Sequence, residues 1–547
     1  MTARAPSGHV DTFCRDHLPP RTLWPEMRYD RAGLAYPARL NCATELLDAM
    51  VARGHGDDPI FLFPGGRWTY ADLLERSNRI ANVLVQDLGV VPGSRVLLRG
   101  PNNPMMAACW FAVLKAGGVV VCTMPLLRPR EIAYTADRAG VTVALTDVRL
   151  EDDCRAGFER TMAGGTRAGA RVVCFNSDAP GSLESLMTSR STAFRNVSTA
   201  ADDVALIAFT SGTTGKGKGT MHFHRDVLAI CDCFPPHVLQ PEPHDVFCGS
   251  PPFAFTFGLG GLVLFPMRIG ASALLLEQAS PPLLLQGIRE FGATISFTAP
   301  TAYRAMLPLL GDGGVPSLRK CVSAGETLPA STFEAWERAT GIRIIDGIGS
   351  TEMLHIFISA RPEAMKAGAT GKPVPGYEAR VVDDDGEDVP AGTIGRLAVR
   401  GPTGCRYLDD VERQQAYVQG GWNITGDSYL VDADGYFVYQ ARTDDMIISS
   451  GHNIAGPEVE SVILEHPAVA ECGVIGVPDE ERGQVVKAFV VLRDGHVAGP
   501  DMAKALQDHV KREIAPHKYP RQVEFVAKLP RTATGKLQRY VLREEGA

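Results

Sequence analysis

Short runs of β-branched and apolar residues alternate with longer amphipathic stretches along much of the chain. RVLLR at 95–99 precedes the helix-like stretch AACWFAVLKAG, and GVVVCTMP at 118–125 then returns to the pattern of a buried strand. The same alternation continues at 141–147, 171–175, 204–209, 293–300, 320–325 and 342–349. Strands and helices in this order predict βαβ units built around a largely parallel sheet.

The pattern changes beyond position 400, where glycine, aspartate and aromatic residues become frequent and ADG at 433–435 signals a turn. A compact α/β segment runs from Pro457 to the end, with a helix expected over 501–514. At 547 residues the chain is longer than one ordinary core requires. We therefore expect a large N-terminal domain over 1–443 and a small C-terminal domain over 444–547.

Composition and charge narrow the classes of partner. The chain is 45% hydrophobic and 22% charged, as in globular proteins, and its formal net charge of −8 argues against nucleic acid or an anionic membrane. The N-terminus lacks the apolar core of a signal peptide. The most apolar window, 257–276, contains Pro266 and Arg268, which favours a buried strand–turn–strand over a membrane span. We expect a soluble cytoplasmic protein, either a monomer or a homodimer.

Twelve cysteines are spread along the chain, most of them in apolar or irregular stretches. Neighbours such as those of Cys109 in AACWF and Cys122 in VVVCT are typical of reduced, buried thiols. The close pair Cys231 and Cys233 has no second pair at metal-ligand spacing, so a zinc site is not expected.

The stretch FTSGTTGKGKGT at 209–220 follows the apolar run VALIA and concentrates glycine, hydroxyl and lysine side chains. Glycines let backbone N–H groups converge on an anion, hydroxyls donate hydrogen bonds, and lysine supplies positive charge. The P-loop pattern does not fit, because Gly217 or Gly219 stands where that motif requires Ser or Thr. We predict a phosphate-binding loop of another kind, with an unliganded flexible loop as the alternative.

Residues 210–219 resemble the phosphate loop T-S-G-T-T-G-x-P-K-G of the adenylate-forming superfamily, which includes acyl- and aryl-CoA ligases, peptide-synthetase adenylation domains and beetle luciferases. Gly217 stands where proline is usual, which makes the loop tip less rigid. The resemblance implies an α/β fold. Its large N-terminal domain would hold parallel-sheet α/β subdomains and a β-barrel-like part, and its small α+β C-terminal domain would be mobile.

Further motifs of the superfamily follow in order: GSTE at 349–352, TGD at 425–427, Arg442, and PRTATGK ending at Lys536. The resemblance implies that Lys536, Glu352 and Thr351 are catalytic, with Glu352 also holding Mg²⁺ on the ATP phosphates. The nucleotide site that it implies consists of Thr210, Ser211, Gly212, Thr213, Thr214, Gly215, Lys218, Gly325, Glu326, Asp346, Gly347, Gly349, Asp427 and Arg442.

The resemblance also implies a hinge between the domains at Asp444, and a coenzyme A channel beside Gly451 and His452. A side chain at position 451 would obstruct the thiol. The superfamily continues with I-x-P-x-E, whereas this chain has IAGPE at 454–458, with its proline displaced by one position. This departure leaves the individual contacts of the loop open.

The acid pocket of the superfamily is lined by three segments, which here are PPFAFTFG at 251–258, SAGE at 323–326 and MLHI at 353–356. DGIGSTEMLHIF resembles benzoate–CoA ligases, and PPFAFTFGLGGLVLFP resembles their 2-aminobenzoate branch. A flat, aromatic-lined slot suits an aryl acid. Amino-acid adenylation domains normally carry an aspartate in this region for the substrate's α-ammonium. Apart from Glu326 these segments hold no acidic residue, which also favours an aryl acid. The lining residues implied are Phe255, Thr256, Phe257, Ala324, Gly325, Gly349, His355 and Ile356.

Two of these residues have alternative interpretations. His355 could hydrogen-bond the substrate or could be a core histidine, and Thr256 could bind an ortho substituent or simply pack. The function implied is an aryl-CoA ligase that uses ATP, Mg²⁺ and coenzyme A on benzoate or 2-aminobenzoate.

Three alternatives remain open at this point. The first is an aryl-acid adenylating enzyme that loads a carrier-protein phosphopantetheine. The second is a P-loop ATPase or kinase, which the failed motif disfavours. The third is a nucleotide-binding protein without ligase activity.

Overall fold

A six-stranded sheet forms the first layer of the large domain in the computed structural model, which describes residues 6–30, 33–163, 170–210, 217–442, 445–449, 452–479, 482–531 and 537–546. The strand order is β6-β5-β3-β4-β7-β8, and every neighbouring pair is parallel except β7 and β8. The predicted βαβ pattern is confirmed here. The strands are β3 (Arg95–Arg99), β4 (Val119–Thr123), β5 (Val143–Asp147), β6 (Arg171–Phe175), β7 (Val204–Thr210) and β8 (Lys218–Phe223).

Helices lie between the strands of this sheet, and one of them, α3, covers most of the helix-like stretch AACWFAVLKAG. The helix α3 is buried along its whole length, which agrees with its apolar sequence. Asn103 caps its N-terminus by accepting a hydrogen bond from the backbone N–H of Met106. The helices of this part are α1 (Phe13–Asp16), α2 (Tyr70–Gln86), α3 (Pro104–Lys115), α4 (Pro129–Ala139), α5 (Glu151–Ala163) and α6 (Leu183–Met187).

A nine-stranded sheet forms the second layer, in the order β15-β14-β13-β12-β11-β9-β10-β1-β2. Its central strands, β10 to β13, are parallel, so their carboxyl ends meet at one edge of the sheet. The strands are β1 (Pro59–Phe63), β2 (Gly66–Thr69), β9 (Val246–Gly249), β10 (Ser272–Leu274), β11 (Ile295–Thr298), β12 (Lys320–Ser323), β13 (Ile344–Gly349), β14 (Ile356–Ser359) and β15 (Lys372–Pro373). The helices are α7 (His224–Phe234), α10 (Pro281–Phe291), α11 (Pro300–Met306) and α12 (Ala330–Thr340).

The apolar window 257–276 was expected to be a strand–turn–strand, and this expectation is wrong. The window is helical in α8 (Thr256–Leu259), the wider turn Gly260–Leu264 and α9 (Phe265–Ile269), and only then enters β10. Residues 258–267 are buried, as in a helix enclosed on all sides by the core. A short apolar run cannot be assigned by periodicity alone when every face is buried.

A third, antiparallel sheet forms the part of the large domain that was expected to be barrel-like. Its strands run in the order β16-β17-β19-β18, with β20 also paired to β19. The elements are β16 (Glu378–Val382), β17 (Gly395–Arg400), α13 (Val411–Tyr417), β18 (Val418–Gln419), β19 (Trp422–Val431) and β20 (Phe437–Arg442).

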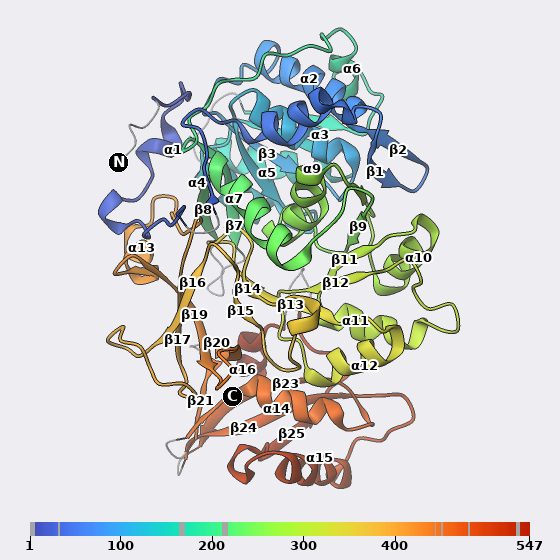
Figure 1. Cartoon of the computed structure of the whole chain (residues 1–547), viewed down its shortest axis with the longest axis vertical. Helices are drawn as coiled ribbons and strands as arrows, with labels where there is room; N and C mark the ends of the chain where they lie inside the picture. Colours follow the sequence, from blue (N-terminus) through green and yellow to red (C-terminus); the bar gives the residue numbers. More distant parts are fainter. Residues whose placement is uncertain are drawn as a thin grey trace.

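The smaller C-terminal domain has its own sheet and its own buried core, whose residues all lie beyond position 446. Figure 1 shows it in orange and red below the rest of the molecule. The expected helix over 501–514 is found as α15 (Pro500–Glu513). The seam predicted at 443/444 falls outside the described residues and stays a prediction. The other elements are β21 (Ile447–Ser449), β22 (His452–Ile454), α14 (Gly456–Glu465), β23 (Val469–Asp479), β24 (Gly483–Leu492), β25 (Gln522–Phe525) and α16 (Arg539–Gly546).

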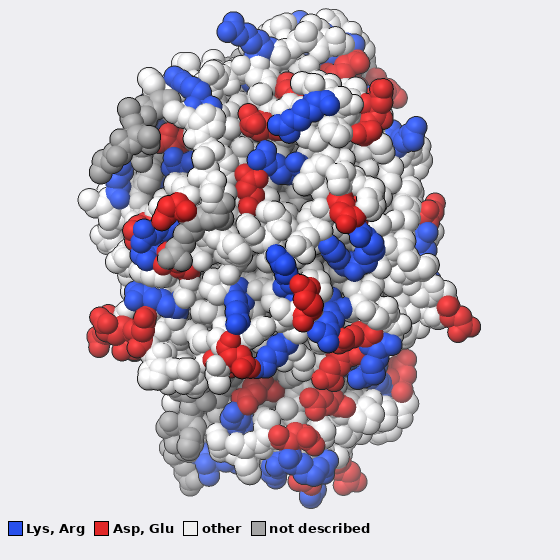
Figure 2. All heavy atoms as spheres, in the orientation of Figure 1, with Lys and Arg blue, Asp and Glu red and all other residues white. Residues whose placement is uncertain are grey.

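The surface and the cysteines give two further findings. Basic and acidic side chains are interspersed over the face of the molecule in Figure 2. All twelve cysteines are free thiols, and eleven of them are buried, as expected from their apolar surroundings.

None of the helices in the described part of the chain is both long and apolar enough to cross a membrane.

Candidate active site

The predicted phosphate loop connects two antiparallel strands. Thr210 at the end of β7 pairs with Lys218 at the start of β8. The Oη of Tyr134 donates to the carbonyl oxygen of Gly217 at 2.9 Å. Ser211, Gly212, Thr213, Thr214 and Gly215 lie outside the described residues, so their predicted contacts with phosphate stay predictions. In Figure 1, β7 and β8 lie above β14 and β13, near the middle of the molecule.

The structure brings Glu352 and Lys218 together around one tyrosine. Glu352 lies in the turn between β13 and β14 and is 9% exposed. Tyr407 donates from Oη to Oε1 of Glu352 at 2.7 Å. The Nζ of Lys218 lies 5.7 Å from the centroid of the Tyr407 ring. A carboxylate and a lysine from separate predicted motifs therefore share one neighbour.

Two further hydrogen bonds hold the turn that contains Thr351 and Glu352. Nε2 of His222 in β8 lies 2.8 Å from the carbonyl oxygen of Thr351, which fixes Nε2–H as the donor. Burial lowers the pKa of His222 to about 4, so the ring is neutral near pH 7. The Oγ1 of Thr403 donates to the carbonyl oxygen of Met353 at 2.7 Å.

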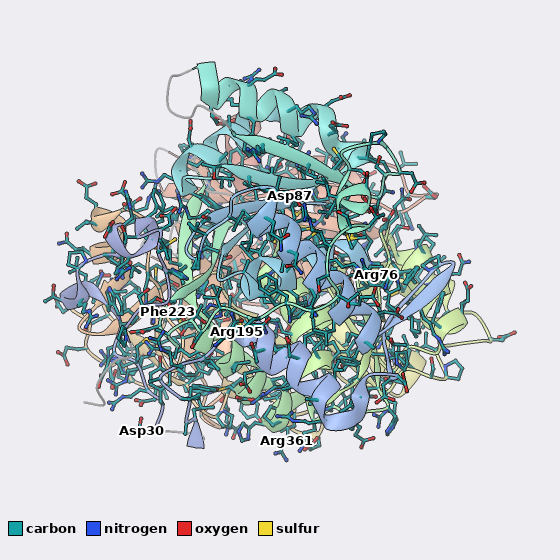
Figure 3. All side chains as sticks on the ribbon, turned by 90° about the horizontal axis from the view of Figure 1, so that it is seen from above. Asp30, Arg76, Asp87, Arg195, Phe223 and Arg361 are labelled. Carbon is teal, nitrogen blue, oxygen red and sulfur yellow. The ribbon has the colours of Figure 1, made fainter. Side chains whose placement is uncertain are left out.

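A buried ion pair supports the segment that carries Tyr407. Arg406 and Asp226 are both fully buried, with Nη1 and Oδ2 2.8 Å apart. The Arg406 guanidinium lies 4.0 Å from the centroid of the Phe223 ring, and Figure 3 labels Phe223 at the end of β8. The backbone of 406–408 also hydrogen-bonds β8, through Met221 N to Arg406 O and Leu408 N to Gly219 O, both at 2.8 Å.

Sequence reasoning missed Tyr407, His222, Arg406 and Asp226. One feature of the sequence could have indicated them. MHFHRD at 221–226 places two histidines and an aspartate beside an apolar run, which is typical of buried polar residues. Buried polar groups of this kind require partners, but the sequence does not say which.

The predicted ribose residues are neighbours on two paired strands. Asp427 in β19 pairs with Arg442 in β20, and Nη1 of the arginine lies 3.0 Å from Oδ1 of the aspartate. Gly426 has a φ of +75°, and a Cβ there would lie 3.1 Å from Nη2 of Arg442. The glycine therefore lets the guanidinium lie against the backbone.

The remaining predicted nucleotide residues lie at the carboxyl ends of adjacent parallel strands. Gly325 and Glu326 follow β12, directly after the predicted pocket residue Ala324, while Asp346, Gly347 and Gly349 belong to β13. Asp346 pairs with Ser323, and burial raises the pKa of its carboxyl group to about 7. Such edges of parallel sheets are common ligand sites.

His355 lies among aromatic rings. Its ring centroid is 4.5 Å from that of Phe265 and 5.7 Å from those of Phe257 and Phe234. Burial lowers its pKa to about 3, so the ring is neutral. A Cβ at Gly260 would lie 2.4 Å from Cδ2 of His355. These contacts fit a core residue and a pocket wall equally well, so the role of His355 stays a prediction.

The other predicted pocket residues divide into two groups. Ile356 pairs with Gly349, where a Cβ would lie 2.7 Å from the carbonyl oxygen of His355, so both belong to the His355 side. Phe255 and Thr256 instead border a cavity of about 10 Å³, which is also lined by Trp110 and Cys122 and not by His355.

The structure describes only some of the site residues predicted in the C-terminal domain. Lys536, Asp444 and Gly451 lie outside the described residues, and His452 is described only as the first residue of β22. The segment 532–536 is flanked by Arg531 and Leu537, which form an antiparallel bridge. The roles predicted for these residues stay predictions.

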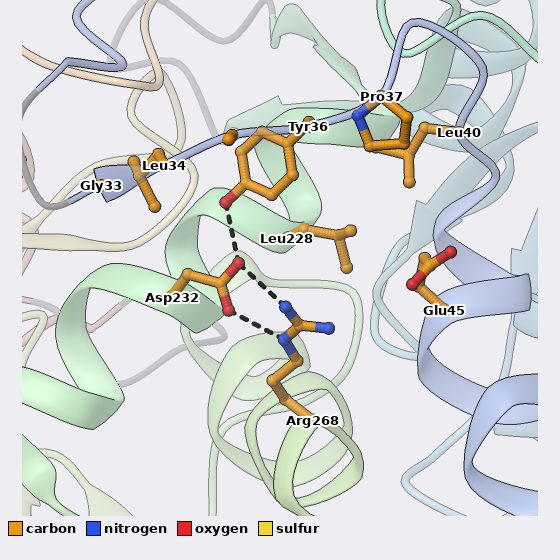
Figure 4. A pocket seen from close by; sticks show the side chains of 10 residues that line it. Gly33, Leu34, Tyr36, Pro37, Leu40, Glu45, Leu228, Asp232 and Arg268 are labelled. Atoms are coloured by element: carbon orange, nitrogen blue, oxygen red, sulfur yellow. Dashed lines mark hydrogen bonds and ion pairs between the residues drawn. The ribbon is translucent and has the colours of Figure 1, made fainter. Parts of the chain in front are cut away.

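A surface cavity of about 360 Å³ lies apart from all the predicted site residues. Figure 4 shows Tyr36 and Arg268 converging on Asp232 at its wall. The Oη of Tyr36 donates to Oδ2 of Asp232 at 2.9 Å, and Nε of Arg268 donates to Oδ1 at 2.8 Å. The three side chains are therefore hydrogen-bonded to one another. No motif of the sequence indicates a ligand for this cavity.

Comparisons with known proteins agree with the fold and the order of motifs. The pattern of the AMP-binding enzyme family matches residues 49–406, and that of the AMP-binding enzyme C-terminal domain matches 458–536. The benzoate–CoA ligase of Thauera aromatica is 36% identical over 516 residues, which cover 93% of this chain and 97% of the relative. The 4-hydroxybenzoate–CoA/benzoate–CoA ligase of Rhodopseudomonas palustris is 33% identical, with 92% and 94% covered.

Solved structures agree with these relatives. An anthranilate CoA ligase in complex with anthranoyl-AMP superposes with a TM-score of 0.87 at 34% identity, covering 93% of this chain and 98% of that one. A benzoate CoA ligase from Burkholderia xenovorans gives 0.85 at 33% identity, with 92% and 100% covered. The chain belongs to the AMP-binding enzyme family. Its resemblance to the adenylate-forming superfamily is confirmed, and within it the chain is an ATP-dependent acid–thiol ligase of the aryl-CoA ligase class.

Proposed function

We propose that the protein converts benzoate or 2-aminobenzoate to its coenzyme A thioester, using ATP and Mg²⁺. The observation that carries this choice is the neutral His355 beside Phe257, both on segments predicted to line the acid pocket, with Phe234 and Phe265 packed around the same ring. Flat aromatic walls with one polar group suit an aryl ring. Two similar proteins act on benzoate, and a third was solved with anthranoyl-AMP.

In the first half-reaction, a carboxylate oxygen of the acid attacks the α-phosphorus of ATP. The bond from that phosphorus to the leaving oxygen breaks, so an acyl adenylate forms and pyrophosphate departs. Negative charge gathers on the attacking carboxylate, the α-phosphate and the departing pyrophosphate. Catalysis therefore depends on positioning these groups and neutralising their charge. Lys218 and Lys536 would supply positive charge, and Asp427 would accept hydrogen bonds from the ribose hydroxyls.

The described residues fit a magnesium ion beside the ATP phosphates. Mg²⁺ prefers hard oxygen ligands and is commonly held by one carboxylate, phosphate oxygens and water. Glu352 would supply such a carboxylate, and the hydrogen bond from Tyr407 to Oε1 holds it in one orientation. Bound there, Mg²⁺ would neutralise charge on the departing pyrophosphate.

In the second half-reaction, the thiol of coenzyme A attacks the acyl carbon, AMP leaves, and the thiol proton is lost to solvent. We propose that the small domain rotates at Asp444 between the two halves, which would bring Gly451 and His452 to the thiol. The two-domain arrangement supports this proposal, because the sheet that carries β22 belongs to the small domain.

The acid preference is tested by thioester formation from benzoate, 2-aminobenzoate, salicylate and a medium-chain fatty acid, each at the same concentrations of ATP, Mg²⁺ and coenzyme A. Benzoate or 2-aminobenzoate should give the highest kcat/KM. A higher kcat/KM for the fatty acid would contradict the proposed aryl pocket.

A further inference from the structure

A polar cluster joins the two domains beside the segment SAGE. Nη1 of Arg531 lies 3.2 Å from Oε1 of Glu326, which follows β12 in the large domain. Nη2 of the same guanidinium lies 2.7 Å from Oε2 of Glu471 in β23. Arg531 therefore bridges one carboxylate of its own domain and one of the other domain.

Arg531 also stands at the base of the segment that ends in Lys536. It forms an antiparallel bridge with Leu537, and the backbone N–H of Gln538 donates to the carbonyl oxygen of Pro530 at 2.9 Å. The two ends of the segment 532–536 are therefore held together. Because one of these ends is Arg531, its contact with Glu326 places the base of the segment against the large domain.

The pair between the domains is partly shielded from water. The side chain of Arg531 is 27% exposed and that of Glu326 is 15% exposed, so salt and water screen the pair less than they screen a fully exposed one. A second contact between the domains involves Arg304 of α11, whose Nη2 donates to the carbonyl oxygen of Val469 at 3.2 Å. That contact ends on a backbone carbonyl, whereas Arg531 adds a charge pair close to the predicted nucleotide site.

We propose that Arg531 is a positioning residue for the adenylate-forming half-reaction, because its pairing with Glu326 docks the base of the Lys536 segment on the large domain. This inference rests on the proposed function. Formation of the bond between the carboxylate oxygen and the α-phosphorus needs the predicted lysine at that atom. The attack of coenzyme A on the finished adenylate does not, so the second half-reaction is independent of the pair.

The test measures each half-reaction separately in the full-length protein. Pyrophosphate release is measured in a single turnover with benzoate and ATP and without coenzyme A. Thioester formation is measured from synthetic benzoyl adenylate and coenzyme A. Arg531→Met should slow pyrophosphate release by about tenfold or more and change thioester formation by less than about twofold. Arg531→Lys, which keeps the charge, should recover part of the rate.

Two matched variants exclude a general loss of structure. Glu471→Gln weakens one contact of Arg531 within the small domain and should leave both half-reactions within about threefold of the wild type. Lys487→Met removes another ion pair of the small domain, that of Nζ with Oε2 of Glu524 at 3.1 Å, and should do the same. If Arg531→Met slows both half-reactions equally or slows neither, or if Glu471→Gln matches it, the inference is wrong.

Docking is also measured without any acid, by hydrogen–deuterium exchange of the backbone amides over 323–328 and 469–474. Exchange should rise in Arg531→Met and stay unchanged in Lys487→Met, and equal exchange in both variants would overturn the docking role. A wild-type protein that releases no pyrophosphate with any aryl acid would contradict the proposed function, and the exchange experiment would still decide the docking role.

Discussion

Tyr407 donates its phenolic hydrogen to Oε1 of Glu352 at 2.7 Å, and both residues are buried. The two residues lie far apart in the sequence, and they meet because the backbone of 406–408 runs beside β8. Hydrogen bonds from a hydroxyl to a carboxylate are short and strong. The bond therefore fixes the orientation of the carboxylate that we propose as a magnesium ligand.

Tyr407→Phe removes this hydrogen bond and keeps the ring. We expect the rate of pyrophosphate release to fall about tenfold and the Mg²⁺ concentration for half-maximal rate to rise, because the carboxylate loses its fixed orientation. Pre-steady-state pyrophosphate release over a range of Mg²⁺ concentrations measures both effects. Tyr436→Phe is the control, since it removes a hydrogen bond of the same length, that from its hydroxyl to the carbonyl oxygen of Ala364 at 2.7 Å. Equal rates in the two variants would contradict the role given to Tyr407.

Asp427→Asn keeps the shape of the side chain and removes its charge. We expect the KM for ATP to rise about tenfold and the KM for the aryl acid to stay within about twofold, because a charged acceptor for the ribose hydroxyls is lost. Steady-state kinetics with each substrate varied in turn separate the two effects. Asp432→Asn serves as the control, because Asp432 pairs with Lys366 at 2.6 Å on the surface. If the KM for the aryl acid rises and the KM for ATP does not, Asp427 does not bind the ribose of ATP.

Gly260→Ala places a methyl group 2.4 Å from Cδ2 of His355 and 2.7 Å from Nε2. The ring is enclosed by aromatic side chains, so it can move only at the expense of the pocket. We expect the KM for the aryl acid to rise about tenfold, with little change in the KM for ATP. Gly313→Ala, where a Cβ meets nothing within 4 Å, is the matched control. An unchanged acid KM in a folded Gly260→Ala protein would argue that His355 is a core residue.

Asp346 makes the stability of the fold depend on pH. Burial raises its pKa to about 7, above the value near 4 of an unfolded chain, so folding favours the protonated form. The stabilisation is complete below about pH 4 and is lost as the pH rises through 7. Between pH 5 and pH 8 the free energy of unfolding of the wild type should fall by about 3 kcal/mol relative to that of Asp346→Asn, because the asparagine stays neutral. Urea unfolding at four pH values measures this difference, and parallel curves would contradict it.

The sequence predicted α15 from its helical periodicity, and it predicted β3 and α3 from the alternation of a short apolar run with a longer one. It failed over 257–276, because an apolar run buried on every face has no periodicity that distinguishes a helix from a strand. Among the predicted site residues, Asp427 and Arg442 are paired on neighbouring strands, and Glu352 lies in the turn between β13 and β14. Tyr407 could not be predicted, because its partner is set by the packing of the 403–408 segment against β8 and no local pattern records that packing.

The most direct test of the proposed reaction is the amount of pyrophosphate, AMP and thioester formed per benzoate consumed, measured with and without coenzyme A. With coenzyme A, we predict that the three products form in equal amounts over many turnovers. Without it, pyrophosphate should stop at about one equivalent per enzyme, because the acyl adenylate stays bound. If coenzyme A does not discharge that adenylate, the acceptor is a carrier-protein thiol and the proposed ligase reaction is wrong.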